Sequence, residues 1–229
     1  MLRIDHVIHA VPDLEAAGTA LSERYGLASE PGGRHPGWGT GNRIVPLGSD
    51  YLELIAVVDP VEAEGSAFGR HVGQRAAGGD RLMGWCVAAE RLDDVAGRLG
   101  LAITSGSRIR PDGTILRWRS AGLEVALTRR FVPFFISWEG PPDVHPGRSP
   151  AEHLARPGGI AWVEVSGRAP ELREWLGGEV LPVRVVDGPD DIRSVGIATE
   201  RGEVILAAGG LTGRRRAAPR GRGTPSLGG

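Results

Sequence analysis

Two apolar segments of this chain each carry one side chain that could do chemistry. The segment "IDHVIHA" (4–10) holds His6 where a valine or isoleucine would serve packing equally well. The segment "YLELIAV" (51–57) holds Glu53. Side chains of a strand alternate between its two faces, so Glu53 shares a face with Tyr51 and not with the neighbouring leucines. A carboxylate in such a strand must face solvent, a partner or a metal, which makes His6 and Glu53 candidate catalytic residues.

Several other residues could shape a ligand site near this pair. Tryptophan offers an apolar body with one N–H donor, and arginine can clamp a carboxylate or phosphate. Core packing of the tryptophans and surface ion pairs of the arginines are the competing readings. The candidate substrate-binding residues are Trp38, Asn42, Arg110, Trp118, Trp138 and Glu139.

The composition excludes several classes of site. Cys86 is the only cysteine in the sequence, which rules out an intrachain disulfide and a cysteine zinc knuckle. All 27 basic residues are arginine, which rules out lysine Schiff-base chemistry. The glycines of 32–41 precede a strand-like run and not a helix, so no nucleotide cofactor is expected. Neither a signal peptide nor a membrane-spanning stretch is recognisable, and we expect a cytoplasmic protein.

The elements that must position these residues follow a recurring pattern. Segments 6–26, 84–100 and 161–178 each open with a β-type run and continue with apolar residues at helical spacing. Asp13 is a good helix N-cap, and Gly26 is a natural helix end. Strand-like runs with turn residues follow each helix, and the unit returns after roughly 75–80 residues. The sequence therefore predicts an α+β fold in which repeated βαβββ units form a curved, half-barrel mixed sheet with helices on its outer face.

This pattern divides the chain into three parts. We expect a paired βαβββ domain over 1–150, a third, shorter βαββ unit packed on it over 151–210, and a disordered tail over 211–229. The tail carries five arginines but no acid and no aromatic residue, so a nucleic-acid partner is not expected.

Smaller segments complete the expected topology. The run "LEVALTR" (123–129) is expected to form a strand, followed by another within "FVPFFISWE" (131–139). Segments 58–80 and 140–159 are expected to be connecting loops.

The unit opened by "IDHVIHAVPDLEAA" and closed by "YLELIAV" resembles the vicinal oxygen chelate superfamily of glyoxalases, bleomycin-resistance proteins and dioxygenases. A closer resemblance is to the glyoxalase-like domain family, whose members carry three characteristic segments. These are of the types "GGRHPGWGTGN", "RPDG…W" and "PFFISW", found here at 32–42, 110–118 and 133–138. The resemblance covers about residues 3–160.

The resemblance implies a cup formed by two facing units around a divalent metal, which chelates two adjacent oxygens of a substrate. It implies His6 and Glu53 as metal ligands, with Mn, Fe, Ni or Zn as the ion, and His35 is the best candidate to complete the set. The implied activity is that of a lyase, isomerase or dioxygenase. The second unit departs from this pattern, because Gly84 stands where His6 stands and no acid follows until Glu139.

Two alternatives remain open at this point. His6 and Glu53 could act without a metal, as a polar contact or an acid/base couple. The whole protein could bind small molecules without chemistry, in the manner of drug-sequestering relatives with a degraded metal site. In either case the partner is a small molecule, and edge strands of such sheets allow a homodimer.

Overall fold

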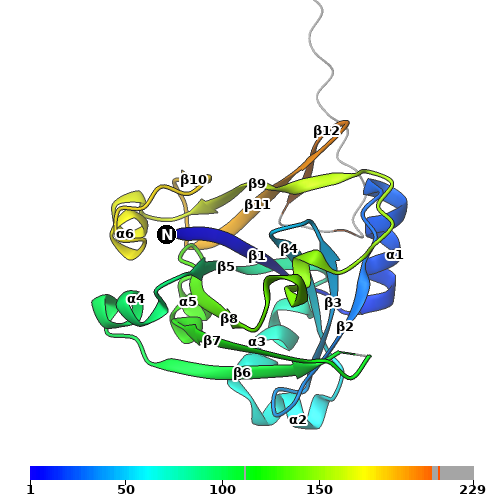
Figure 1. The fold of residues 1–229 in the computed structure, drawn as a ribbon, viewed down its shortest axis with the longest axis horizontal. Helices are drawn as coiled ribbons and strands as arrows, with labels where there is room; N and C mark the ends of the chain where they lie inside the picture. The colour runs from blue at the N-terminus through cyan, green and yellow to red at the C-terminus, as the bar shows by residue number, and fades with distance from the viewer. Residues whose placement is uncertain (111, 208–210, 212–229) are drawn as a thin grey trace, which may run out of the picture.

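The computed structural model describes residues 1–110, 112–207 and 211 (Figure 1). The predicted tail, 211–229, therefore lies outside the described residues except for Leu211, which is buried.

The first part of the chain forms a strand, a helix and three strands. These are β1 (Leu2–Ala10), α1 (Leu14–Tyr25), β2 (Glu30–His35), β3 (Thr40–Pro46) and β4 (Tyr51–Val57). The predicted helix ends are confirmed. The Asp13 side chain accepts a hydrogen bond from the Ala16 N–H, and Gly26 ends α1 in the left-handed conformation.

Segment 58–80 is not the connecting loop that we expected from the sequence. It contains α2 (Pro60–Gly65) and α3 (Ala67–Ala76), capped at their N-termini by the side chains of Asp59 and Ser66. Phe68, Val72 and Ala76 follow one another at four-residue intervals and are buried. This helical spacing, with Pro60 at the first turn, was the signal in the sequence.

The second part repeats the order of strand, helix and strands with one addition. It comprises β5 (Arg81–Ala89), α4 (Leu92–Leu99), β6 (Ile103–Ile109), β7 (Ile115–Ala121), α5 (Leu123–Thr128) and β8 (Phe134–Glu139). The strand expected over 123–129 is wrong, because this segment is the short helix α5. Gly122, in the left-handed conformation, turns the chain out of β7, and the buried Ala126 lies within the resulting helical turn.

The eight strands β1 to β8 close into a barrel, where the sequence had predicted a half-barrel. Their order is β1-β4-β3-β2-β6-β7-β8-β5, with β1 antiparallel to β5 and parallel to β4. On the other side the two halves meet through a single residue pair, Arg34 and Ile109, between β2 and β6. The sheet is mixed, as predicted. Leu21 of α1 and Leu92 of α4 belong to the core that covers the outer face of the barrel.

A second sheet follows two short 3₁₀ turns, η1 (Pro142–Val144) and η2 (Pro146–Arg148), which lie in the segment expected to be a loop. Its elements are β9 (Pro157–Ser166), α6 (Ala169–Trp175), β10 (Val183–Val186), β11 (Asp191–Thr199) and β12 (Gly202–Ala207). The strand order is β10-β9-β11-β12. Its apolar residues, among them Val163 and Val195, share one core with Trp85 and Phe131 of the second part. The division of the chain at residue 150 stays a prediction.

Among the described helices, none has the length and apolar character needed to cross a membrane.

Candidate functional site

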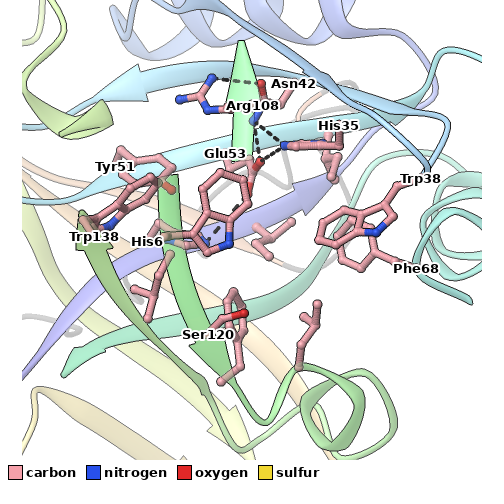
Figure 2. A pocket seen from close by; sticks show the side chains of 16 residues that line it. His6, His35, Trp38, Asn42, Tyr51, Glu53, Phe68, Arg108, Ser120 and Trp138 are labelled. Carbon is pink, nitrogen blue, oxygen red and sulfur yellow. Dashed lines mark hydrogen bonds and ion pairs between the residues drawn. The ribbon is translucent and has the colours of Figure 1, made fainter. Parts of the chain in front are cut away.

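A hollow lies inside the barrel, and we call it the cup (Figure 2). Its cavity volume is about 50 Å³, room for a few water molecules. One part of its wall is polar and the other is aromatic and aliphatic. The polar part consists of His6, His35, Asn42, Tyr51, Glu53 and Arg108.

Strand alternation and one irregularity of β1 bring the first two candidates together. Tyr51 and Glu53 of β4 line the cup, while the intervening Leu52 belongs to the outer core, as the alternation predicted. In β1 a register shift separates Ile4 from His6. Ile4 therefore belongs to the outer core while His6 lines the cup, although the two residues are an even number apart.

Glu53 lies between two imidazoles, as Figure 2 shows. Its Oε2 is 3.8 Å from Nε2 of His6, and its Oε1 is 3.8 Å from Nε2 of His35. All three side chains are buried. The amide nitrogen of Asn42 donates a hydrogen bond of 2.5 Å to Oε1 of Glu53 and lies 3.4 Å from Nε2 of His35. The structure therefore places the three residues predicted as metal ligands around one point of the cup.

Asp5 is a residue of the site that the sequence reasoning missed. It is fully buried, and its Oδ1 is 2.8 Å from Nδ1 of His6. Because a carboxylate only accepts, the hydrogen of His6 resides on Nδ1, and Nε2 faces Glu53. Asp5 also accepts from Nε1 of Trp138 at 3.2 Å and lies 3.1 Å from Nε2 of His145. The bulge that lets two successive residues of β1 point inward has no signature in the sequence.

The pKa of the Asp5 carboxyl reflects these partners. Burial raises it, but the hydrogen bonds from His145 and then from His6 outweigh this effect and hold the pKa well below its usual range. The carboxylate is therefore charged at neutral pH, and it fixes the orientation of His6.

His35 is oriented in a similar way by a different partner. Its Nδ1 is 3.0 Å from the hydroxyl oxygen of Thr40. Burial lowers the pKa of His35 to about 4, and Arg108 adds to this, although Glu53 opposes it. The imidazole is therefore neutral at neutral pH, the form in which histidine binds metals.

Arg108, which the sequence analysis did not propose, lines the cup, whereas Arg110 does not. Nη1 of Arg108 donates to the carbonyl oxygen of Gly32 and lies 3.4 Å from Oδ1 of Asn42. This contact fixes the Asn42 amide so that its nitrogen points at Glu53.

Arg110 and Glu139 are not brought to the cup. Strand β6 ends at Ile109, and Arg110, in the turn that follows, donates to the carbonyl oxygen of Val144 at 2.8 Å. Glu139 is the last residue of β8 and is exposed. Each of the two residues lies at or beyond the end of its strand, which keeps its side chain out of the cup lining.

Two aromatic pairs form part of the remaining wall, together with Ile8, Ile55, Ser120, Leu123, Phe134 and Ile136. The ring centroids of Trp38 and Phe68 are 4.7 Å apart, and those of Trp118 and Trp138 are 5.5 Å apart. Trp38 is carried by the turn between β2 and β3. Only glycine fits at position 39, because this turn packs directly against α2. A Cβ there would lie 2.2 Å from the backbone nitrogen of Ala63, and the φ of +65° is itself unfavourable for other residues. All three tryptophans predicted to shape the site line the cup.

The ionisable side chains of the cup come mainly from the first four strands. His6, His35 and Glu53 lie on β1, β2 and β4. Among the described residues of the second part that line the cup, Arg108 is the one ionisable group, and the others are apolar or, like Ser120, a hydroxyl. The second unit has Gly84 in place of a histidine and no acid in its last strand before Glu139. As a result, its half of the cup is largely apolar.

Asp5, His6 and Cys86 form a tight group of possible metal-binding atoms, all within 4.8 Å of one another. Burial raises the pKa of the Cys86 thiol well above its usual value, which disfavours the thiolate that binds metals. The oxygens of Asp5 already accept hydrogen bonds from neighbouring side chains. This group therefore serves to orient His6 and is a poorer metal site than the residues around Glu53.

Two buried groups are expected to have opposite effects on the stability of the protein between pH 4 and 6.5. His35, with its pKa lowered from 6.5 to about 4, contributes about 3 kcal/mol of stability that is gained as the pH rises through this window. Burial raises the pKa of Asp50 from 3.8 to about 6, although the Ile160 N–H opposes this. Between pH 3.8 and about 6, Asp50 is ionised in the unfolded chain but still largely protonated in the folded protein. The free energy of unfolding therefore falls by about 3 kcal/mol as the pH rises through this window.

Urea unfolding across this pH range separates the two groups. With His35→Gln the free energy of unfolding should fall as the pH rises from 4 to 6, and with Asp50→Asn it should rise. Parallel pH profiles of the two variants would show that these groups do not titrate as the structure indicates.

The chain is similar to known proteins in sequence and in fold. A family model described as a glyoxalase-like domain matches residues 4–180. No curated protein matches the chain at a significant level. Among solved structures, a hypothetical protein from Staphylococcus aureus has a TM-score of 0.61 and 17% sequence identity, covering 90% of this chain and 84% of that one. Methylmalonyl-CoA epimerase from Mycobacterium tuberculosis has a TM-score of 0.43 and 19% identity, covering 62% and 90%. The first of these likenesses shows a shared fold.

Proposed function

Because the chain belongs to the glyoxalase-like domain family, we propose that it is a divalent-metal-dependent lyase or isomerase acting on a small oxygenated substrate in the cup. The observation that carries this proposal is the position of the Glu53 carboxylate between the Nε2 atoms of His6 and His35, 3.8 Å from each. Two imidazoles and one carboxylate form a common ligand set for a catalytic metal with positions left for substrate.

The donor atoms fit such an ion in their chemistry. His35 is neutral at neutral pH, and the Nδ1–H of His6 is held by Asp5. Metal-ligating histidines in proteins usually have an orienting partner of this kind on the second ring nitrogen, and Thr40 provides the one for His35. His6, His35 and Glu53 would hold the ion, with Mn, Fe, Ni or Zn as the candidates.

When bound, a divalent ion would polarise two adjacent oxygens of a substrate as a Lewis acid. The chain's own residues account for the remaining functions. Oε2 of Glu53, on the side of His6, is placed to accept a proton from a substrate carbon. Asp5 and Thr40 hold the two imidazoles, and the aromatic pairs exclude water from the cup.

A second candidate function is small-molecule binding without chemistry. The observation in its favour is that Asn42 already satisfies Oε1 of Glu53, while the second half of the cup provides a largely apolar wall. In this case His6 and Glu53 would be polar anchors for an aromatic ligand. Dioxygenase chemistry, a homodimer and a cytoplasmic location stay predictions.

Metal titration separates the two candidates. The metal-free protein, purified without a metal-binding tag, is titrated calorimetrically with Mn²⁺, Fe²⁺, Ni²⁺ and Zn²⁺. We expect one equivalent of ion to bind and to raise the melting temperature, and His35→Ala to abolish both effects. A protein that binds no ion but binds apolar aromatic compounds tightly would be a binding protein and not an enzyme of this kind.

A further inference from the structure

A second hollow adjoins the cup, and we call it the groove. Its volume is about 460 Å³, against about 50 Å³ for the cup. The two hollows share five lining residues, which are Trp38, Phe68, Trp118, Ser120 and Leu123. Figure 2 shows Trp38, Phe68 and Ser120 on the side of the cup away from Asn42 and Arg108. The groove therefore lies next to the cup, on the side of the cup away from Asn42 and Arg108.

The cup alone is too small for most organic ligands. Pockets that bind drug-sized molecules measure about 300–1,000 Å³, and the cup has room for only a few heavy atoms. A ligand whose oxygens reach Glu53 must therefore extend out of the cup. Two hollows share lining residues with the cup: the groove shares five, and a hollow of about 360 Å³ shares Ile136 and Trp138. Together the cup and the groove fit an elongated ligand that has a polar head and a longer body.

The lining of the groove defines the chemistry of this body. Leu101, Val125 and Leu127 provide apolar surface, and Thr104 and Ser105 provide hydroxyls. Glu124 is the one charged side chain among the described residues that line it. A phosphate or carboxylate on the ligand body would therefore find no cation in the groove and would meet the charge of Glu124.

Gly106 of β6 leaves room for the indole ring of Trp118, which lines both hollows. A Cβ at this position would lie 2.4 Å from the indole ring of Trp118. Without that atom, Trp118 lies flat against the strand and forms a common wall of the cup and the groove.

From this geometry we propose that the groove binds the uncharged, largely aliphatic body of an elongated substrate whose paired-oxygen head enters the cup. The assignment of the head to the cup rests on the proposed function, whereas the assignment of the body to the groove rests on the size of the groove, its position beside the cup and its charge.

The test uses hydroxamates, because their two adjacent oxygens imitate the proposed head and their chain length can be varied. Acetohydroxamate, hexanohydroxamate and octanohydroxamate are titrated into the full chain loaded with one equivalent of Ni²⁺. Each added methylene is expected to tighten binding by up to about fourfold, and octanohydroxamate should bind at least about 100-fold more tightly than acetohydroxamate. The monohydroxamate of octanedioic acid, which ends in a carboxylate, should lose at least about tenfold of this gain, and Glu124→Gln should restore part of it.

Two matched variants on β6 show where the alkyl chain of the hydroxamate binds. Ser105→Trp fills the groove and should remove most of the gain with chain length while leaving the affinity for acetohydroxamate within about twofold. Ser107→Trp places the same side chain at an exposed position of the same strand outside the groove and should leave the whole series unchanged.

A second arm does not depend on a metal. In the metal-free protein, n-octanol should shift the methyl NMR signals of Leu101, Leu123 and Leu127. If acetohydroxamate fails to bind the loaded protein, the proposed function fails, and the octanol shifts still decide on the groove. Affinities independent of chain length, together with unmoved methyl signals, would overturn the groove proposal and leave the proposed function standing. Equal binding of the ω-carboxylate would overturn its uncharged character.

Discussion

Glu53→Gln is expected to lower the affinity of the metal-free protein for a divalent ion by more than about 100-fold, beyond the 10- to 100-fold range typical of residues that only orient ligands. The amide retains the size of the carboxylate but removes the negative charge that lies 3.8 Å from both imidazole nitrogens. It also replaces an oxygen that accepts from Asn42 with a group that can donate. Calorimetric titration with Mn²⁺ and Ni²⁺ measures the loss directly.

The control for Glu53→Gln is Glu23→Gln on the exposed face of α1, which should bind metal as the unchanged protein does. Thermal melting of the two variants checks that each is folded. Full metal affinity in a folded Glu53→Gln variant would remove this carboxylate from the metal site and favour the binding-protein alternative.

Asp5→Asn is expected to destabilise the protein by about 3–5 kcal/mol, the usual cost of removing one partner from a buried charged network. It should also weaken metal binding by about 10- to 100-fold, because the His6 ring loses the partner that orients it. The pKa of Asp5 is held below its usual range, so its stabilising effect is present above about pH 4 and is lost as the pH falls below that value. Urea unfolding between pH 2 and 7 should show this acid loss in the unchanged protein and much less of it in the variant.

Two further variants separate the roles of Asp5. His145→Gln removes a partner of Asp5 but not His6, so it should cost stability without the loss in metal affinity. Asp143→Asn, at an exposed position of η1, should change neither quantity. If Asp5→Asn were as stable as the Asp143 variant, the network around Asp5 would not have the structural role that we assign to it.

The sequence predicted the residues that regular strand geometry controls. Glu53 faces the cup because β4 is a regular strand in which every second side chain points inward, and that alternation is visible in "YLELIAV". His35 was proposed from its place before a strand, and it lies at the end of β2 beside Glu53. These positions depend on local periodicity, which a single sequence contains.

What the sequence could not predict depends on irregular or distant contacts. Asp5 was missed because it points inward only through the bulge in β1, and its partner His145 lies 140 residues away. Arg108 was not considered and Arg110 was proposed, because the end of β6 is not evident from the residues around it. The helix α5 was mistaken for a strand, since a six-residue apolar segment fits both periods.

The joint between the two halves of the barrel has a consequence for entry into the cup. β2 and β6 share one pair, Arg34 and Ile109, whereas β1 and β5 pair along most of their length. Parting the wall at β2 and β6 therefore disrupts few backbone hydrogen bonds, and the main side-chain link to be broken is that of Arg108 to Gly32. His35 lies at the end of β2, so this sparsely paired part of the barrel wall lies beside one of the proposed metal ligands.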